Sequence, residues 1–250
     1  MDNDKQTTIR TYQVWDAPVR WFHWINFICI VGLLFMGFMM LYKAELGITS
    51  VEAKIALKVI HVLIGYVFVI NLLIRLLWAF VGNRHARWSA LLPGKATIGE
   101  AAGYIRAVRE GKPQPYLGHN PLGRMAVTLI LLLLLIMAVT GLIRAGTDIY
   151  YPPLGGWVST YIAAEGVDPA ALKPYDETQV DPDRMKKVKE FKGPIGEIHV
   201  YTAYVLLGII VLHILAVIVT DKREGGAIIS AMFTGRKYLV GKPRDEGGNT

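Results

Sequence analysis

The chain has 250 residues, 53% of them hydrophobic, and a formal net charge of +7 at pH 7. An average soluble domain has about 45–50% apolar residues, and here the excess is gathered into four long blocks, which excludes an ordinary soluble domain. The single cysteine, Cys29, excludes an internal disulfide and an iron–sulfur cluster ligated by this chain alone. The sequence has no Cys-x-x-Cys-His motif, which excludes an ordinary covalent c-type haem.

The first two apolar blocks predict two membrane-spanning helices. Residues 1–18 are expected to form a polar cytoplasmic leader, and Asp16-Ala17-Pro18 provides a start signal for a helix over 20–42. This block is too long for the apolar core of a cleavable signal peptide, so we expect it to be retained. A second helix is predicted over 55–81, where the only charges are Lys58 and Arg75.

The second half of the chain predicts two further spans, each long enough to cross about 30 Å of hydrocarbon. Because hydrocarbon offers no partner for backbone amides, the spans are expected to be helical. The predicted fold is an all-α integral membrane four-helix bundle that forms a single domain over 1–250. The two further spans are predicted at 125–145 and 197–220. A basic connection at 82–124, which includes a short amphipathic helix over 96–110, precedes them. A long connection at 146–195 lies between them, and a tail at 221–250 follows.

The distribution of charge predicts the side on which each connection lies. The connection 82–124 holds seven Lys or Arg and two Glu, whereas the short connection 43–54 holds two of each sign. Basic connections stay on the cytoplasmic side, so we expect both termini and the tail in the cytoplasm and residues 146–195 in the periplasm. The basic residues of the connection 82–124 are therefore explained by topology and by contact with lipid headgroups, and no nucleic acid is expected as a partner.

Four histidines lie within the apolar blocks. His199 and His213 are fourteen residues apart on one predicted helix, which separates them by about 21 Å along the axis and brings them within about 40° of one face. The predicted topology places His61 at the depth of His199 and His23 at the depth of His213. Two depth-matched pairs predict two bis-histidine haem b sites. The alternative is ordinary hydrogen bonding between helices.

Further residues are candidates for contacts with the two macrocycles. Gly37 is fourteen residues after His23, on the same face and at the level of the His61 and His199 pair. A missing side chain there lets a flat ring approach, although small residues are also common in helix packing. Arg75 is fourteen residues after His61 and is predicted to meet a haem propionate, unless it extends to the lipid headgroups. Arg20 and Arg144 lie at span ends, where either role applies.

The entrance to the third predicted span suggests a quinone site. His119 and Asn120 lie there and could donate hydrogen bonds to a quinone carbonyl. A helix cap before Pro121 explains the same residues equally well. His85 lies in the same basic connection and is expected to be solvated.

Several motifs between about residue 12 and 238 carry a resemblance to a known family. They are DAPVRWFHW at 16–24, RLLWAFVGNR at 75–84, GHNP at 118–121 and the two histidines of the last span. The chain resembles the b-type cytochrome subunits of membrane-bound nickel–iron hydrogenases, within the wider prokaryotic di-haem cytochrome b561 group. The resemblance implies two haems b on residues matching His23, His61, His199 and His213, and a quinone site near one haem.

The predicted function is electron transfer across the bacterial inner membrane, between a periplasmic redox partner and the quinone pool. The long connection 146–195 departs from the usual hydrogenase subunit, so the partner is expected to be either a hydrogenase or a multihaem c-type cytochrome. An electron-transfer subunit is favoured over an enzyme acting alone, and a homodimer is left open. The alternatives are a stand-alone superoxide:quinone or metal reductase, and a histidine-lined metal or proton transporter. The apolar blocks hold no Asp or Glu, which disfavours transport of hard cations.

Overall fold

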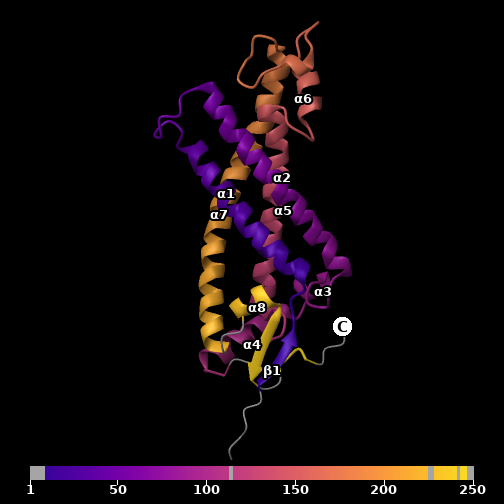
Figure 1. Ribbon diagram of the computed structural model, residues 1–250, viewed down its shortest axis with the longest axis vertical. Coiled ribbons are helices and arrows are strands. Elements are labelled where there is room, and N and C mark those ends of the chain that lie inside the picture. The colour runs from indigo at the N-terminus through magenta and orange to yellow at the C-terminus, as the bar shows by residue number, and fades with distance from the viewer. Residues whose placement is uncertain (1–8, 113–114, 225–227, 241–242, 247–250) are drawn as a thin grey trace, which may run out of the picture. The chain divides into compact units, whose positions relative to one another are not determined.

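The computed structural model describes residues 9–112, 115–224, 228–240 and 243–246 (Figure 1). Their structure is mostly helical. The long helices are α1 (Ala17–Leu41), α2 (Val51–Val81), α5 (Pro121–Ile149) and α7 (Pro182–Glu224). The short elements are β1 (Ile9–Gln13), α3 (Trp88–Leu91), α4 (Thr97–Arg109), α6 (Gly155–Ile162), the 3-10 turn η1 (Pro169–Ala171), α8 (Ile228–Thr234) and β2 (Arg236–Val240).

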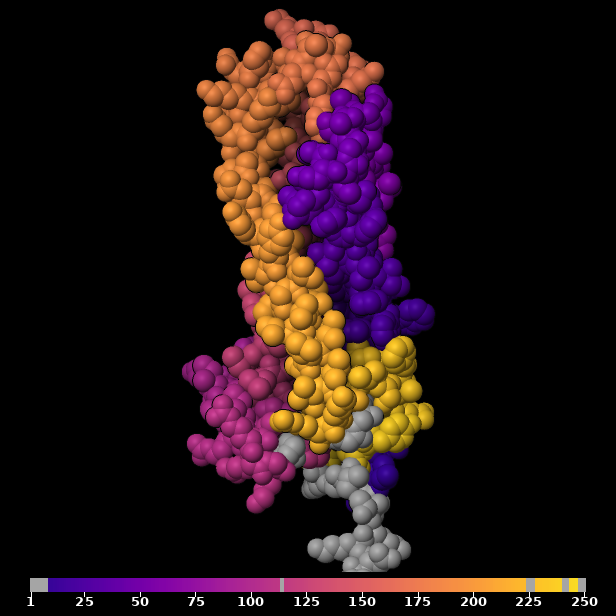
Figure 2. Space-filling model, turned by 90° about the vertical axis from the view of Figure 1, so that its left-hand side faces the viewer, coloured from indigo at the N-terminus to yellow at the C-terminus, as the bar shows by residue number. Residues whose placement is uncertain are grey.

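The four long helices confirm the predicted membrane spans. Each contains a window with a mean hydropathy between 2.2 and 2.9, and within these windows only 6% to 22% of the residues are buried by the protein. Helix α7, orange in Figure 2, presents a long uncovered apolar side. Apolar side chains left uncovered over such lengths are stable in lipid rather than in water. The chain is therefore a multi-pass membrane protein.

All four long helices contain more residues than the predicted spans, and α5 and α7 differ most. Helix α5 continues to Ile149 instead of ending at 145, and α7 begins at Pro182 instead of 197. The start of α7 has its own cap, because Asp181 accepts a hydrogen bond from the backbone N–H of Arg184 at 3.0 Å, and proline suits the first helical position. Apolar periodicity does not reveal this polar turn, so the prediction placed the boundary too late.

Packing divides the chain into two compact units, and each long helix contributes to both. The first unit comprises 1–24, 73–132 and 207–250, and the second comprises 25–72 and 133–206. The two units are described separately below.

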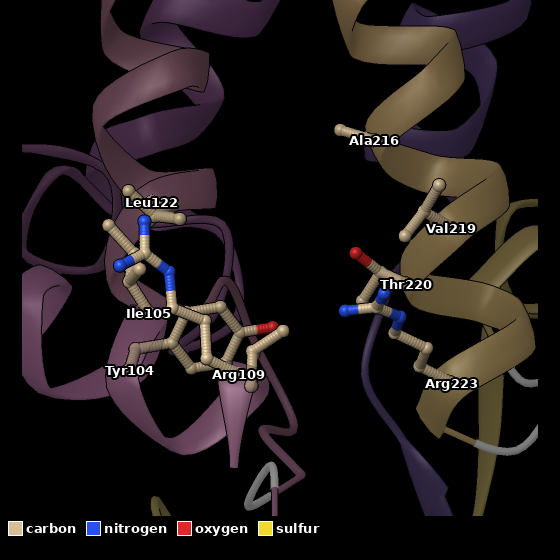
Figure 3. A pocket seen from close by; sticks show the side chains of 9 residues that line it. Tyr104, Ile105, Arg109, Leu122, Ala216, Val219, Thr220 and Arg223 are labelled. Atoms are coloured by element: carbon tan, nitrogen blue, oxygen red, sulfur yellow. The ribbon is translucent and has the colours of Figure 1, made fainter. Parts of the chain in front are cut away.

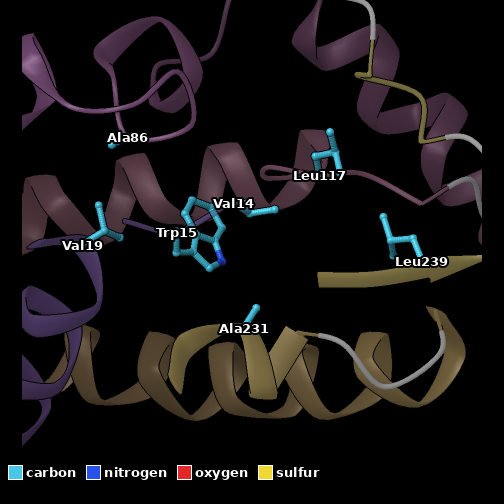
Figure 4. Packing of buried hydrophobic residues seen from close by; sticks show 7 residues of the cluster. All are labelled: Val14, Trp15, Val19, Ala86, Leu117, Ala231 and Leu239. Carbon is cyan, nitrogen blue, oxygen red and sulfur yellow. The ribbon is translucent and has the colours of Figure 1, made fainter. Parts of the chain in front are cut away.

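The first unit contains a small sheet that the sequence does not predict. Strands β1 and β2 pair in antiparallel fashion, with Ile9 opposite Val240 and Gln13 opposite Arg236. Beside the sheet, apolar side chains from distant segments gather around Trp15 (Figure 4). They are Val14, Trp15, Val19, Ala86, Leu117, Ala231 and Leu239. Part of the predicted leader and part of the predicted tail therefore form this core, and residues 1–8 lie outside the described part of the chain.

Asp16 fixes the start of α1 in this unit. Its Oδ1 accepts a hydrogen bond from the backbone N–H of Val19 at 3.3 Å, as expected for a helix cap. Its Oδ2 accepts one from Trp78 Nε1 at 2.8 Å and one from the backbone N–H of Asn83 at 3.3 Å. The start signal read from the sequence thus also joins the beginning of α1 to the end of α2.

The second unit includes a folded connection between α5 and α7. Its core is formed by side chains of α6, of the segment after η1 and of the first turns of α7. They are Val158, Ile162, Ala163, Leu172, Val180, Met185 and Val188. Tyr66 of α2 donates a hydrogen bond to the carbonyl oxygen of Pro152 at 2.6 Å. The predicted loop 146–195 is therefore a small structured region that packs on α2.

Candidate functional site

His61 of α2 and His199 of α7 lie next to each other in the second unit. The centroids of their imidazole rings are 6.3 Å apart, and the ring planes are inclined by 69°. Both residues are half-buried. The Nδ1 atom of His61 is buried and has no hydrogen-bond partner of standard geometry among the described residues. The two histidines that the depth argument paired are neighbours in space.

Thr140 of α5 orients the ring of His199. The Thr140 hydroxyl oxygen lies 2.8 Å from His199 Nδ1 and 2.7 Å from the carbonyl oxygen of Ile136. Because the hydroxyl proton is donated to Ile136, the oxygen accepts from the Nδ1–H of His199. This tautomer leaves the lone pair on Nε2, which is the atom available to a metal. The sequence analysis missed Thr140, although it interrupts an apolar block.

Glycines leave room beside both rings of this pair. A Cβ atom on Gly37 of α1 would lie 4.0 Å from Cε1 of His61, and one on Gly141 of α5 would lie 3.4 Å from Cε1 of His199. A larger side chain at either position would extend over an imidazole. Gly37 was predicted at the level of this histidine pair, whereas Gly141 was not singled out.

A buried carboxylate with three cations lies at the end of α5 in the same unit. The side chain of Asp148 is 9% exposed and contacts Arg144 at 2.7 Å, Lys192 at 2.9 Å and Lys58 at 3.4 Å. Arg144 also packs across Gly196 of α7, where a side chain would collide with its guanidinium. The sequence analysis missed Asp148 because the predicted span ended before it.

The net charge of this cluster is positive and acts on the paired histidines. Three cations around one carboxylate leave an excess of two positive charges. Arg144 interacts electrostatically with both His61 and His199. An anionic group placed beside these rings would therefore be stabilised.

His23 of α1 and His213 of α7 both belong to the first unit. An electrostatic interaction links their half-buried rings. The Nδ1 atom of His23 is buried and has no hydrogen-bond partner in the part of the chain that the structure describes. The edge of the His23 ring faces Trp24, with ring centroids 5.1 Å apart. This unit therefore contains the second predicted pair.

Two predicted arginines also lie in the first unit. Arg75 is 6% exposed, so it does not extend to the lipid headgroups. Its Nη1 donates a hydrogen bond to the carbonyl oxygen of Ala86 at 3.2 Å, and its guanidinium lies 5.9 Å from the ring of Phe22, next to His23. Arg20 donates through Nη1 to the carbonyl oxygen of Phe233, while its buried Nε has no partner among the described residues.

The structure gives Asn120 a capping role. Its Oδ1 accepts a hydrogen bond from the backbone N–H of Gly123 at 2.7 Å, and its Nδ2 donates to the hydroxyl oxygen of Tyr104 at 2.9 Å. The neighbouring His119 packs against Trp15 with ring centroids 4.9 Å apart, and its buried Nδ1 has no partner among the described residues. Burial first, and then nearby cations, lower the pKa of His119 to about 3, so the ring is neutral.

The expectation for His85 is wrong. It is 8% exposed and therefore buried rather than solvated. Its ring meets Trp15 edge-on with centroids 6.3 Å apart, and its Nε2 accepts a hydrogen bond from Arg84 at 3.1 Å. Burial lowers the pKa of His85, as does the charge of Arg84. Only tertiary packing around Trp15 encloses this histidine.

Comparison with known proteins identifies the family of the chain. The family described as prokaryotic cytochrome b561 matches residues 14–235. The chain belongs to this family. As a member, it is a multi-pass b-type cytochrome of the bacterial inner membrane that takes part in electron transfer, and a b-type cytochrome carries haem b.

Curated relatives of this cytochrome are named as hydrogenase subunits. A probable Ni/Fe-hydrogenase B-type cytochrome subunit of Rhizobium leguminosarum bv. viciae is 34% identical over 173 residues, which cover 62% of this chain and 70% of the relative. The protein of the same name from Azotobacter vinelandii is 35% identical over 168 residues, covering 62% and 68%. A probable Ni/Fe-hydrogenase 1 B-type cytochrome subunit of Escherichia coli K12 is 30% identical over 148 residues, covering 55% and 61%. No solved structure matches the chain.

Proposed function

We propose that this cytochrome carries electrons across the inner membrane, between a periplasmic redox partner and the quinone pool, through two haem b groups. The observation that carries the proposal is the distribution of the four histidines. Each compact unit contains one pair, His23 with His213 and His61 with His199, and each pair joins two different helices. Two pairs at separate levels of α7 provide the ligands for two haems.

The residues of the His61 and His199 pair fit an iron held between two imidazoles. The 6.3 Å between the two ring centroids is compatible with one iron that both imidazoles would hold. Neutral imidazole is the form that binds iron, and a haem held by His61 and His199 would supply one-electron transfer. Thr140 orients the ring of His199, and Gly37 and Gly141 keep side chains away from the space beside the two rings.

Positive charge near each pair suits the anionic propionate groups of haem. In the second unit, Arg144 supplies this charge, together with the excess cations around Asp148. In the first unit, we assign this role to Arg20 and Arg75. Arg20 is on α1, as is His23, and the guanidinium of Arg75 on α2 lies near the ring of Phe22, the residue before His23. A buried guanidinium is well suited to hydrogen-bond a carboxylate with two donors.

Electrons enter or leave at the two ends of this path. The basic connection 82–124 supports a cytoplasmic location for both termini, which assigns the His61 and His199 pair to the periplasmic side. The names of the relatives support a hydrogenase as the periplasmic partner. The folded region between α5 and α7 then offers a surface for docking, and a multihaem c-type cytochrome is the other candidate.

Quinone is proposed to react near the His23 and His213 pair. His119 and Asn120 are candidates for binding it, since both belong to the same compact unit as that pair. Because Asn120 caps α5, a quinone would have to share its amide with Gly123 and Tyr104. The buried Nδ1 of His119, which has no partner among the described residues, is the better placed of the two groups.

The proposal is tested by electron transfer across a closed vesicle. The purified chain is placed in liposomes that contain ferricyanide, and a quinol is added outside. We expect ferricyanide reduction by the intact chain and its loss in both His61→Ala and His213→Ala, but not in Leu212→Ala, which changes an exposed side chain of α7. Transfer that survives the loss of either histidine pair contradicts the two-haem path. Turnover of superoxide or a metal complex by the isolated chain supports the stand-alone reductase instead.

A further inference from the structure

A cavity in the first unit is unrelated to the histidine pairs. It has a volume of about 300 Å³ and is open on one side. In Figure 3, one wall comes from α4 and the start of α5, and the facing wall comes from the last turns of α7. The lining side chains belong to Tyr104, Ile105, Val108, Arg109, Leu122, Ala216, Val219, Thr220 and Arg223.

The lining of the cavity combines an apolar surface with two cations. Ile105, Leu122 and Val219 are among its apolar residues, and Arg109 and Arg223 contribute its charge. Both arginines are exposed, and neither has an ion-pair partner among the described residues. Two unpaired guanidinium groups beside an apolar surface favour a ligand that has both an anionic group and a hydrocarbon part.

The cavity lies where α7 leaves the hydrocarbon. The sequence of α7 carries no charged residue from Ile198 to Thr220, and charges begin at Asp221. Helix α4 is too short to span a membrane, and it exposes Ile98 by 74% while its last turn is basic. A helix with this pattern lies along the membrane surface. The cavity is therefore positioned at the level of the lipid headgroups.

We propose that this cavity binds an anionic phospholipid. Its phosphate lies between Arg109 and Arg223, within reach of the Thr220 hydroxyl, and its acyl chain follows Leu122 and Val219 into the membrane. A soluble anion would leave the apolar wall uncovered, and a zwitterionic lipid would leave the two cations incompletely neutralised. The lipid would bridge α4 and α7, and this role does not depend on haem.

The test is lipid binding measured by native mass spectrometry of the full chain in mild detergent. Dioleoyl-phosphatidylglycerol is titrated against dioleoyl-phosphatidylethanolamine. The double variant Arg109→Gln/Arg223→Gln is expected to bind the phosphatidylglycerol about 25-fold more weakly, since each cation beside the anionic group of the lipid contributes roughly fivefold to binding. The control is Arg106→Gln/Lys222→Gln, which removes the same two charges from exposed neighbouring positions on the same helices. The control is expected to bind like the unchanged chain.

A steric pair of variants gives a second readout that keeps all charges. Ala216→Trp fills the cavity and is expected to abolish selective retention of phosphatidylglycerol, whereas Leu215→Trp, at an exposed position outside the lining, is expected to preserve it. The proposal is overturned if the two lipids bind equally to the unchanged chain. It is also overturned if the control double variant loses as much binding as the test variant. Detection of a bound quinone in place of the phospholipid, lost in Ala216→Trp, would overturn it as well.

Discussion

The hydroxyl oxygen of Thr140 lies 2.8 Å from Nδ1 of His199, and this contact fixes the tautomer of an imidazole whose ring centroid is 6.3 Å from that of His61. The hydroxyl is held by the carbonyl oxygen of Ile136 in the preceding turn of α5, so it accepts the Nδ1 proton. A hydrogen bond from the distal nitrogen of a ligating imidazole raises its basicity. Thr140 is thus a positioning residue for the proposed haem site.

Replacing Thr140 should change the redox potential of one haem without removing it. In Thr140→Val the hydrogen-bond acceptor is lost, the imidazole becomes less basic, and oxidised iron is less stabilised, so the midpoint potential should rise. A hydrogen bond of about 1 kcal/mol corresponds to roughly 40 mV for one electron. Potentiometric titration of the α-band measures this shift. Thr140→Ser keeps the hydroxyl, so its midpoint potential should equal that of the unchanged chain. An unchanged potential in Thr140→Val would show that the contact does not tune the site.

Asp148→Asn should destabilise the second unit and raise the potential of the same haem. The carboxylate holds Arg144, Lys192 and Lys58, and its loss leaves three cations without their shared partner. Because the cations are partly exposed, we expect a loss of about 2 kcal/mol, less than for a fully buried pair. The added positive charge disfavours oxidised iron. Thermal unfolding and potentiometry measure the two effects.

The matched control for Asp148 is Glu190→Gln. Glu190 is an exposed acid of α7, and no ion pair involves it among the described residues. Both variants remove one negative charge, so an effect of net charge alone would appear in both. Equal shifts in stability and potential would contradict a specific role for the Asp148 cluster.

Arg75 should influence the haem proposed for His23 and His213. Arg75→Leu removes a buried positive charge, which should lower the midpoint potential of one haem because oxidised iron becomes relatively more stable. Arg75→Lys keeps the charge but loses the hydrogen-bonding geometry of the guanidinium, so its potential should change less. Both variants also lose the hydrogen bond from the guanidinium to Ala86, so a difference in potential between them reports the charge rather than that bond. Potentials that stay the same in both variants would rule out the propionate role.

The stability of the first unit should decrease below neutral pH. The pKa of His119 is lowered from 6.5 to about 3, so between these values the unfolded chain binds a proton that the native chain does not. Unfolding should therefore become easier as pH falls below 6.5, by at most about 1.4 kcal/mol per pH unit for this group. Thermal unfolding at pH 7.5 and 5.5 measures the change. His119→Phe, which keeps a ring against Trp15, should show a smaller difference, and an equal difference would exclude His119 as its source.

Local sequence pattern predicted the spans and the neighbours of the histidines, because both follow from helical periodicity and the thickness of a membrane. It placed His61 at the depth of His199 and Gly37 at the level of that pair, and the structure brings His61 close to both of these residues. It missed the end of α5, and therefore Asp148, because one extra helical turn has no signature in hydropathy. It also missed the pairing of β1 with β2 and the burial of His85, which arise from contacts between segments far apart in the chain.

The proposed function requires the chain to bind two haems, one on each pair of histidines. The most direct measurement is the number of haems per chain by pyridine haemochrome, for the unchanged chain and for single His→Ala variants of His23, His61, His199 and His213. We expect two haems b in the unchanged chain and one in each variant, with the His61 and His199 variants losing the same component of the redox titration. A preparation from haem-replete cells that contains one haem or none, or variants that keep both, would contradict it.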